Sequence, residues 1–293
     1  MKGTEPMAGG IRVAGIQMAS DGSQEELFAR AEAAARKAAG SGAHLACLYE
    51  LFAHRFFPTA WTPEAFAMAE TLEGATLRFG RRLAQECGMW MIVPFFERDE
   101  ATGRYYNSVA AVDPDGRIRM HYRKMHLPLN PRNMEQRYFS PGEPAMELID
   151  VRGVRAAVMI CYDRHYPELA RVAALKGAHV IMVPSSIQRA RGRTDTWRAE
   201  LVARAVENGV YVVGINRTGS EGPAAFVGNS VAVDPYGSVI AELGGESGLL
   251  LADIDPALVR QAQEEFGHLR DLRSEAYLTL LNLTRAPLPS SNR

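Results

Sequence analysis

Short apolar runs bounded by turn residues alternate along this chain with longer segments of helical period, and this alternation constrains the fold more than any other feature. It is typical of a layered α/β protein and argues against an all-β or helical-bundle architecture. In the first half we expect strands at 12–18, 44–49, 89–97, 105–113 and 117–122, with helices at 24–39 and 63–87. Pro63 would open the second helix behind Thr62 as its cap.

After a stretch at 128–144 that is rich in Pro and Asn, the same order of elements begins again. We expect strand 155–161, helix 167–176, strand 179–183, helix 194–208 and strand 210–216, followed by strands 230–234, 238–243 and 248–253. Both halves therefore alternate strands with helices and end in consecutive strands. The charged segment from Pro256 to about Tyr277 is expected to be helical and to leave the body of the fold.

One local match supports a duplicated architecture. The segments NSVAAVDPDGRI (107–118) and NSVAVDPYGSVI (229–240) each indicate a strand, an Asp-Pro-x-Gly turn and a second strand. Such turns are common, so coincidence is the alternative. A true duplication predicts an α/β fold that is a four-layer α-β-β-α sandwich with two pseudo-symmetric halves. Because no flexible linker separates the halves, we expect one domain at 11–255, a disordered leader at 1–10, and a helical extension and tail at 256–293.

Charge and motif content narrow the function. The 33 Lys and Arg residues nearly balance the 34 Asp and Glu residues, which argues against a dedicated nucleic-acid or membrane-surface protein. No apolar run reaches the roughly 20 residues of a membrane span, and the first residues lack a signal-peptide core. Three cysteines are too few for a disulfide framework, so we expect a cytoplasmic protein.

Nucleotide-binding glycine motifs and the serine-hydrolase elbow are absent from the sequence, and we expect no cofactor. His121, His126 and His165 could converge near Cys161, but their spacing matches no standard zinc pattern, so we expect no metal. The only partner that we expect, apart from copies of the chain itself, is a small-molecule substrate.

Reactive groups in open α/β sheets gather just beyond the carboxyl ends of strands, and Cys161 lies at such a place. It ends the apolar run AAVMI and precedes a predicted helix, whose N-terminus, together with Arg164 and His165, would favour the thiolate. A cysteine at a strand end is also commonly a small core residue. That interpretation suits Cys47 and Cys87 better, because they lie within a predicted strand and a predicted helix.

Glu50 and Lys124 also follow predicted strands. Glu50 lies among apolar and aromatic residues in ACLYELFAHRFFP, where burial would raise its pKa toward the range of a general base. The alternative is a carboxylate that swings out to solvent. Lys124, in HYRKMHLP, could stabilise negative charge on a reacting carbonyl, or it could be a solvated surface lysine beside Arg123.

Together, Glu50, Lys124 and Cys161 resemble the Glu-Lys-Cys triad of the nitrilase superfamily, the carbon-nitrogen hydrolases. YRKMHLP resembles the superfamily's lysine motif, and ICYDRHYPELARVAALKGAHVIMVPS resembles its nucleophile motif. Further similarity in GIQM, ENGVYVVGINRTG, FVGNSVAVDPYGSVIAE and HLRDLRSEAY extends the resemblance over 11–277. The resemblance implies a nitrilase-like α-β-β-α sandwich, the same fold that periodicity predicts.

The resemblance also implies roles for individual residues. Glu50 would take the thiol proton, and Cys161 would attack an amide or ureido carbon to form a thioester. Lys124 and the backbone N–H of Tyr162 would hold the oxyanion. Glu135, in NMEQRYFSPG, matches a second glutamate that would orient Lys124 and the substrate nitrogen, although by itself it would be interpreted as a loop carboxylate.

The residues after the nucleophile bear on the substrate. CYDRHYPE is most similar to the N-carbamoyl amino acid and β-ureidopropionate amidohydrolases, in which an arginine matching Arg164 grips the substrate carboxylate. An ion pair with Asp163 or Glu168 is the alternative for that arginine. His126 matches a pocket position. Carbamoylputrescine hydrolases, whose substrate is cationic, lack this arginine and are a poorer match.

The chain departs from the D-carbamoylase branch at two positions. His165 replaces a second arginine, and Tyr162 replaces an asparagine, which weakens the case for a D-α-carbamoyl substrate. We therefore expect hydrolysis of an N-carbamoyl amino acid, α or β, to the amino acid, ammonia and carbon dioxide. The alternatives are an aliphatic or ω-amidase and a catalytically silent interaction module. The family resemblance further implies a homodimer or a higher even-numbered oligomer.

Overall fold

Two six-stranded sheets form the centre of the molecule, which a computed structural model describes over residues 9–283. The first sheet and its helices are β1 (Ile11–Gln17), α1 (Gln24–Gly40), β2 (Leu45–Leu48), α2 (Ala75–Cys87), β3 (Trp90–Arg98), β4 (Tyr105–Val112), β5 (Ile118–Arg123) and β14 (Gly248–Ile254). The second comprises β6 (Ile149–Val151), β7 (Val154–Val158), α3 (Pro167–Leu175), β8 (Val180–Ser185), α4 (Arg193–Asn208), β9 (Tyr211–Asn216), β12 (Val231–Val233) and β13 (Val239–Glu242). A short hairpin joins β10 (Ser220–Glu221) to β11 (Ala224–Ala225).

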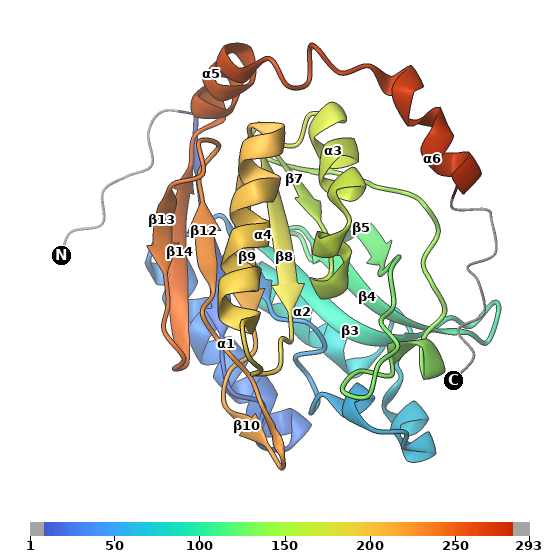
Figure 1. The fold of residues 1–293 in the computed structure, drawn as a ribbon. Helices are drawn as coiled ribbons and strands as arrows, with labels where there is room; N and C mark the ends of the chain where they lie inside the picture. Colours follow the sequence, from blue (N-terminus) through green and yellow to red (C-terminus); the bar gives the residue numbers. More distant parts are fainter. Residues whose placement is uncertain (1–8, 284–293) are drawn as a thin grey trace.

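The sheets pack face to face, with helices on the two outer sides (Figure 1). Helices α1 and α2 cover the first sheet, and α3 and α4 cover the second. Strands β1 and β9 contact each other across the two sheets. A Cβ added to Gly15 would lie 2.9 Å from Ile215 Cγ1, so glycine is required for this approach. The predicted four-layer α-β-β-α sandwich is confirmed.

The strand orders show how the two halves correspond. They are β14-β1-β2-β3-β4-β5 and, in reverse direction, β6-β7-β8-β9-β12-β13. Strand β14, expected in the second half, instead pairs antiparallel with β1 along its whole length. Strand β6, which the periodicity did not predict because three residues are too short to show it, takes the matching place beside β7. Each half thus has one antiparallel edge strand, three parallel strands and a hairpin.

The Asp-Pro-x-Gly turn that the sequence predicts in both halves forms in both halves of the structure. Asp113 Oδ1 accepts hydrogen bonds from the backbone N–H groups of the residues two and four positions later, at 3.0 and 2.9 Å, and Asp234 Oδ1 does the same at 2.9 and 2.9 Å. Gly116 and Gly237 close the two turns with φ values of 80° and 89°, a left-handed conformation that favours glycine.

A second correspondence, which the sequence comparison of the halves overlooked, lies in the tripeptide Gly-Ala-His before β2 and again before β8. The His44 ring accepts a hydrogen bond through Nδ1 from Arg12 N at 3.0 Å, and the His179 ring accepts one from Arg155 N at 3.0 Å. In each half, therefore, the histidine ring links the first two parallel strands, β1 and β2 in the first half and β7 and β8 in the second.

The predicted helix at 63–87 is wrong in its first part. Pro63–Met68 forms a 3-10 turn, and the chain then runs extended beside β3, where Glu70 N donates to Phe96 O and Arg98 N donates to Glu70 O, both at 2.8 Å. The Glu70 carboxylate next accepts from Thr76 N at 2.6 Å and so caps α2. Pairing with a neighbouring strand here outweighs the local helical pattern.

The helical segment expected at 256–277 is also divided. Helix α5 (Pro256–Phe266) ends at Gly267, with a φ of 69°, and α6 (Leu278–Leu283) follows after an irregular stretch. Val259 of α5 is buried in the core, so α5 docks on the body, whereas Figure 1 shows α6 on an arm that leaves it.

Residues 1–8 of the predicted leader and 284–293 of the predicted tail lie outside the described residues, and the boundaries at 11 and 255 stay predictions. Within 9–283, no helix is both long and apolar enough to cross a membrane.

Candidate active site

Three of the predicted site residues follow strand ends and meet between the sheets. Glu50 lies just after β2, Lys124 just after β5, and Cys161 shortly after β7, at the start of a 3-10 turn (Cys161–His165). The backbone φ is 51° at Leu51 and 45° at Cys161, a left-handed conformation that is strained for both residues. Such strain persists only where the surrounding structure holds it, and it is concentrated at functional sites.

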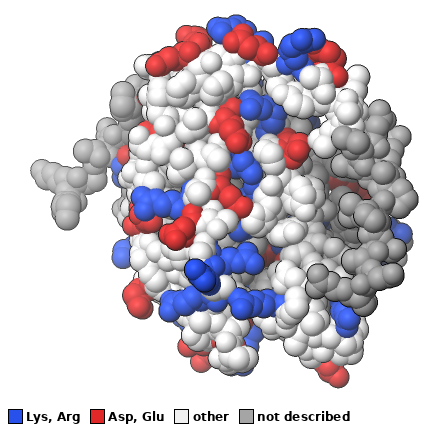
Figure 2. Space-filling view, in the orientation of Figure 1, with Lys and Arg blue, Asp and Glu red and all other residues white. Residues whose placement is uncertain are grey.

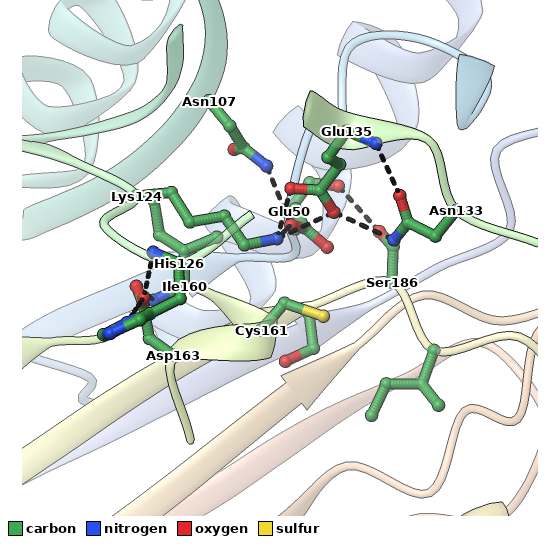
Figure 3. Close-up of polar contacts among 12 residues, drawn as sticks. Glu50, Asn107, Lys124, His126, Asn133, Glu135, Ile160, Cys161, Asp163 and Ser186 are labelled. Carbon is green, nitrogen blue, oxygen red and sulfur yellow. Dashed lines mark hydrogen bonds and ion pairs between the residues drawn. The ribbon is translucent and has the colours of Figure 1, made fainter. Parts of the chain in front are cut away.

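The Lys124 ammonium lies between two carboxylates (Figure 3). Its Nζ is 2.7 Å from Glu50 Oε1 and 2.8 and 2.7 Å from the two carboxylate oxygens of Glu135. All three side chains are fully buried. Glu50 Oε2 has no hydrogen-bond partner among the described residues. This leaves one oxygen of a buried carboxylate available to accept a proton.

Burial and charge act against each other on this cluster. Burial lowers the pKa of Lys124, but the charges of Glu135 and Glu50 outweigh it and raise that pKa above its ordinary value. Burial raises the pKa of Glu135 to about 7, although Lys124 opposes the rise. The Lys124 ammonium therefore stays charged at neutral pH, and the Glu135 carboxylate takes up a proton more readily than an ordinary glutamate.

The expectation that the surroundings of Cys161 favour its thiolate form is not met, because burial outweighs the nearby positive charge. Burial raises the pKa of the Cys161 thiol to about 12, and the nearby Glu50 charge adds to the rise, while Lys124 and Arg164 oppose it. Figure 3 shows Cys161 beside the Glu50–Lys124–Glu135 cluster. A neutral thiol next to a carboxylate with an unpartnered oxygen needs a base for activation, and Glu50 is placed to be that base.

Two asparagines that sequence reasoning missed complete the cluster. Asn107 Nδ2 donates to Glu50 Oε1 at 2.8 Å, and Asn133 Nδ2 donates to Glu135 Oε1 at 2.9 Å. Asn107 opens the repeated NSV segment, a signal that could have marked it. Asn133 is two residues before Glu135 in a loop, where asparagine is common, so no sequence signal distinguished it.

Asp163 is a further buried residue that sequence reasoning left without a role at the site. It accepts hydrogen bonds from the Tyr122 hydroxyl at 2.7 Å, from Ile160 N at 3.1 Å, and from both the backbone N and the ring Nδ1 of His126, at 3.0 and 2.9 Å. The His126 ring also stacks on Tyr166, with centroids 3.6 Å apart. Asp163 thus links the Cys161–His165 turn to the segment that carries Lys124.

Arg164 lies beside Cys161 but does not form either of the alternative ion pairs expected for it. Its Nη1 donates to Cys161 O at 2.8 Å, and its Nε donates to Glu200 of α4 at 2.7 Å. His165 Nδ1 contacts the other oxygen of Glu200. Glu200, thirty-five or more residues away in sequence, carried no local signal of this role.

The three histidines considered for convergence at Cys161 do not share a site. His121 contacts Glu97 at 2.8 Å, while His126 contacts Asp163 and His165 contacts Glu200. Over residues 9–283, no group of three or more His, Cys, Asp or Glu side chains is arranged to hold a metal ion.

A pocket of about 60 Å³ opens beside Cys161. The residues of the Cys161–His165 turn that line it include Tyr162, Arg164 and His165, and Arg132 and the first residue of α4, Arg193, also line it. Its lining contains three arginines and one histidine but no Asp or Glu. A small volume with cationic walls suits a small substrate that carries negative charge.

The two-sheet sandwich, with a buried thiol, ammonium and carboxylates beyond its strand ends, has the architecture of the nitrilase fold. The family model described as carbon-nitrogen hydrolase matches residues 12–264, so the chain belongs to the carbon-nitrogen hydrolase family. This confirms the resemblance stated on the sequence motifs.

Individual relatives agree with this assignment. The chain is 31% identical to the N-carbamoylputrescine amidase of Arabidopsis thaliana, over 93% of this chain and 96% of that protein. It is 32% identical to the citrullinase of Francisella tularensis, over 91% and 96%. The crystal structure of a carbon-nitrogen hydrolase from Helicobacter pylori G27 superposes with a TM-score of 0.88 and 30% identity, over 93% of this chain and 98% of that one.

Proposed function

We propose that the protein cleaves the carbamoyl C–N bond of N-carbamoyl amino acids, α or β, such as N-carbamoyl-β-alanine. The observation that carries this proposal is the cationic pocket beside Cys161 with no carboxylate in its lining. Such a pocket favours a substrate with a carboxylate and disfavours a cationic one such as N-carbamoylputrescine. Citrulline, the compound in a relative's name, combines a ureido group with an amino acid carboxylate.

The chemistry follows from the cluster. The unpartnered Oε2 of Glu50 takes the thiol proton as Cys161 Sγ bonds to the ureido carbon, and the carbonyl oxygen becomes an oxyanion. The Lys124 ammonium, with the backbone N–H of Tyr162, stabilises that charge. Since Lys124 contacts three carboxylate oxygens of Glu50 and Glu135 at rest, the oxyanion must replace one of these contacts.

The intermediate then collapses in two stages. The C–N bond to the terminal nitrogen breaks, and ammonia leaves with the proton returned from Glu50. The same carboxylate then takes a proton from water, the resulting hydroxide attacks the carbon of the thiocarbamate, the C–S bond breaks, and Glu50 returns the proton to the Cys161 sulfur. The released carbamic acid loses carbon dioxide and yields the amino acid.

The carboxylate of the substrate has several cations available. Arg164 is already paired with Glu200, whereas Arg132 and Arg193 are exposed and form no ion pair within residues 9–283. Figure 2 shows Lys and Arg side chains gathered in front of the N-terminal end of α4, where the exposed Arg189 and Arg191 precede Arg193. Of these arginines, Arg193 lines the pocket and, together with Arg132, adds positive charge to it.

Ammonia release from a matched panel tests the substrate class. The panel holds N-carbamoyl-β-alanine, an N-carbamoyl-α-amino acid, N-carbamoylputrescine and a plain aliphatic carboxamide, with Cys161→Ala as the blank. The highest kcat/KM is expected for a carbamoyl acid. A preference for the plain carboxamide would replace the proposal with the ω-amidase or aliphatic amidase alternative, and no turnover together with an unreactive Cys161 would favour an interaction module.

We propose, further, that the protein is cytoplasmic and forms a homodimer or a higher even-numbered oligomer. Sedimentation at micromolar concentration tests the second statement, and a monomer would overturn it.

A further inference from the structure

Arg217 is a buried arginine just beyond β9 that the chemistry above leaves without a role. Its side chain has no exposure to solvent, and it is not part of the pocket lining at Cys161. The guanidinium carbon lies 4.9 Å from the ring centroid of Tyr49, 5.6 Å from that of Phe56 and 5.3 Å from that of Phe226. An arginine so deeply buried is expected to have specific partners.

Half of its six side-chain hydrogen bonds go to backbone carbonyls at or shortly after the proposed general base, and the others go to Ser186, Ser20 and Glu221. Arg217 Nη2 donates to the carbonyl oxygens of Glu50 at 3.1 Å and Leu51 at 2.9 Å. Its Nε donates to Ser186 Oγ at 3.0 Å, and Ser186 Oγ in turn donates to Glu50 O at 2.9 Å. The remaining nitrogen, Nη1, donates to His54 O at 3.0 Å and pairs with Glu221. The Glu50 carbonyl therefore accepts two hydrogen bonds from the second half.

These contacts join parts of the chain that must be aligned for catalysis. Glu50 belongs to the first sheet, whereas Ser186, Arg217 and the nucleophile Cys161 follow strands of the second sheet. The left-handed backbone at Leu51 needs support from its surroundings, and Arg217 supplies it at the Leu51 carbonyl. We propose that Arg217 is a positioning residue that holds the Glu50 backbone in register with Cys161. This inference rests on the proposed role of Glu50 as general base.

Arg217→Lys is the informative substitution. Lysine keeps the charge opposite Glu221, but one ammonium cannot reach the Glu50 and Leu51 carbonyls and Ser186 as the planar guanidinium does. We expect kcat for ammonia release to fall by about 10- to 100-fold, the scale of a misplaced catalytic group, with KM changed by less than about twofold.

A second measurement separates positioning of Glu50 from general damage. In the Glu50→Gln background, alkylation of Cys161 by fluoroacetamide reports on the thiol and the pocket without the general base. The Cys161 sulfur bonds to the methylene carbon, fluoride leaves, and the thiol proton passes to solvent. We expect Arg217→Lys to leave this rate unchanged, because its effect acts through Glu50.

Ser186→Ala repeats the test with a smaller change, should Arg217→Lys fail to fold. It removes one hydrogen bond to Glu50 O, so we expect kcat to fall by about fivefold. Ser185→Ala is the matched control, since Ser185 is the adjacent buried serine and its Oγ donates to Val183 O, away from Glu50. This control is expected to retain the wild-type kcat.

The outcomes are distinct. Any of three results would overturn the positioning role. The first is an equal loss of kcat in Ser186→Ala and Ser185→Ala, and the second is an unchanged kcat in Arg217→Lys. The third is alkylation in the Glu50→Gln background that Arg217→Lys slows as much as it slows turnover. Full activity of Glu50→Gln itself would instead overturn the general-base proposal on which the inference rests.

Discussion

Replacing Lys124 with methionine removes the cation that lies between two fully buried carboxylates, and the folded protein should become less stable as a result. The Lys124 ammonium makes three contacts of 2.7–2.8 Å with Glu50 and Glu135. Breaking a buried ion pair by deleting one partner costs about 3–5 kcal/mol, because uncompensated charge stays buried. At about 2 °C per kcal/mol for a chain of this size, the midpoint of thermal unfolding should fall by about 6–10 °C at neutral pH.

The loss should depend on pH with a defined sign. The pKa of Glu135 is already raised by burial to about 7, and removing the Lys124 charge raises it further. A folded-state pKa above the unfolded value of about 4.3 means that the folded form keeps a proton which the unfolded form releases. Stability is therefore lost as the pH rises from about 4.3 through the folded pKa, and the deficit of Lys124→Met should be larger at pH 8 than at pH 5.

Thermal unfolding of wild type and variant at both pH values measures this difference. The double variant Lys124→Met/Glu135→Gln removes one of the stranded charges and should recover part of the lost stability. A deficit that is equal at the two pH values, together with no recovery in the double variant, would refute the view that buried carboxylate charge causes the loss.

Three further predictions concern the frame around the site. Burial lowers the pKa of both His44 and His179, so the unfolding free energy should fall as the pH drops below about 6.5, and denaturant titrations of His44→Gln and His179→Gln should show a weaker dependence on pH. In Asp163→Asn, an amide N–H group faces two of the donors from which the Asp163 carboxylate accepts hydrogen bonds, so the free energy of unfolding, measured with denaturant, should fall by about 1–3 kcal/mol. An unchanged free energy of unfolding would contradict the role of Asp163 in linking the Cys161–His165 turn to the segment that carries Lys124. Gly15→Ala places a methyl 2.9 Å from Ile215 Cγ1 and should destabilise by about 1–3 kcal/mol, whereas no change in the melting temperature would show that the sheets can separate freely.

Periodicity was sufficient to predict most of this fold because long apolar runs and helices repeat in the same order in both halves. It failed where pairing between distant segments decides the structure. Strand β14 joins the first sheet although it follows the second in sequence, and the chain beside Glu70 pairs with β3 where the local pattern indicated a helix. Such choices depend on neighbours that are remote along the chain.

The site shows the same division. That Glu50, Lys124 and Cys161 lie together was predictable, because each follows a strand and lies in a motif that resembles one of the family. The supporting residues Glu200 and Arg217 were not, because their roles depend on hydrogen bonds across 36 to 167 positions of sequence. Local reasoning also misjudged the Cys161 thiol, since a nearby cation suggested ionisation while burial, visible only in the fold, favours the neutral form.

The most direct measurement of the central claim, that Cys161 is the nucleophile of an amide-binding pocket, is peptide mass spectrometry after treatment of the folded protein with fluoroacetamide. One acetamide adduct is expected on Cys161, with none on Cys47, which is fully buried, or on Cys87, which lies at the end of α2 away from the pocket. Adducts on Cys87 with Cys161 unmodified would contradict the account.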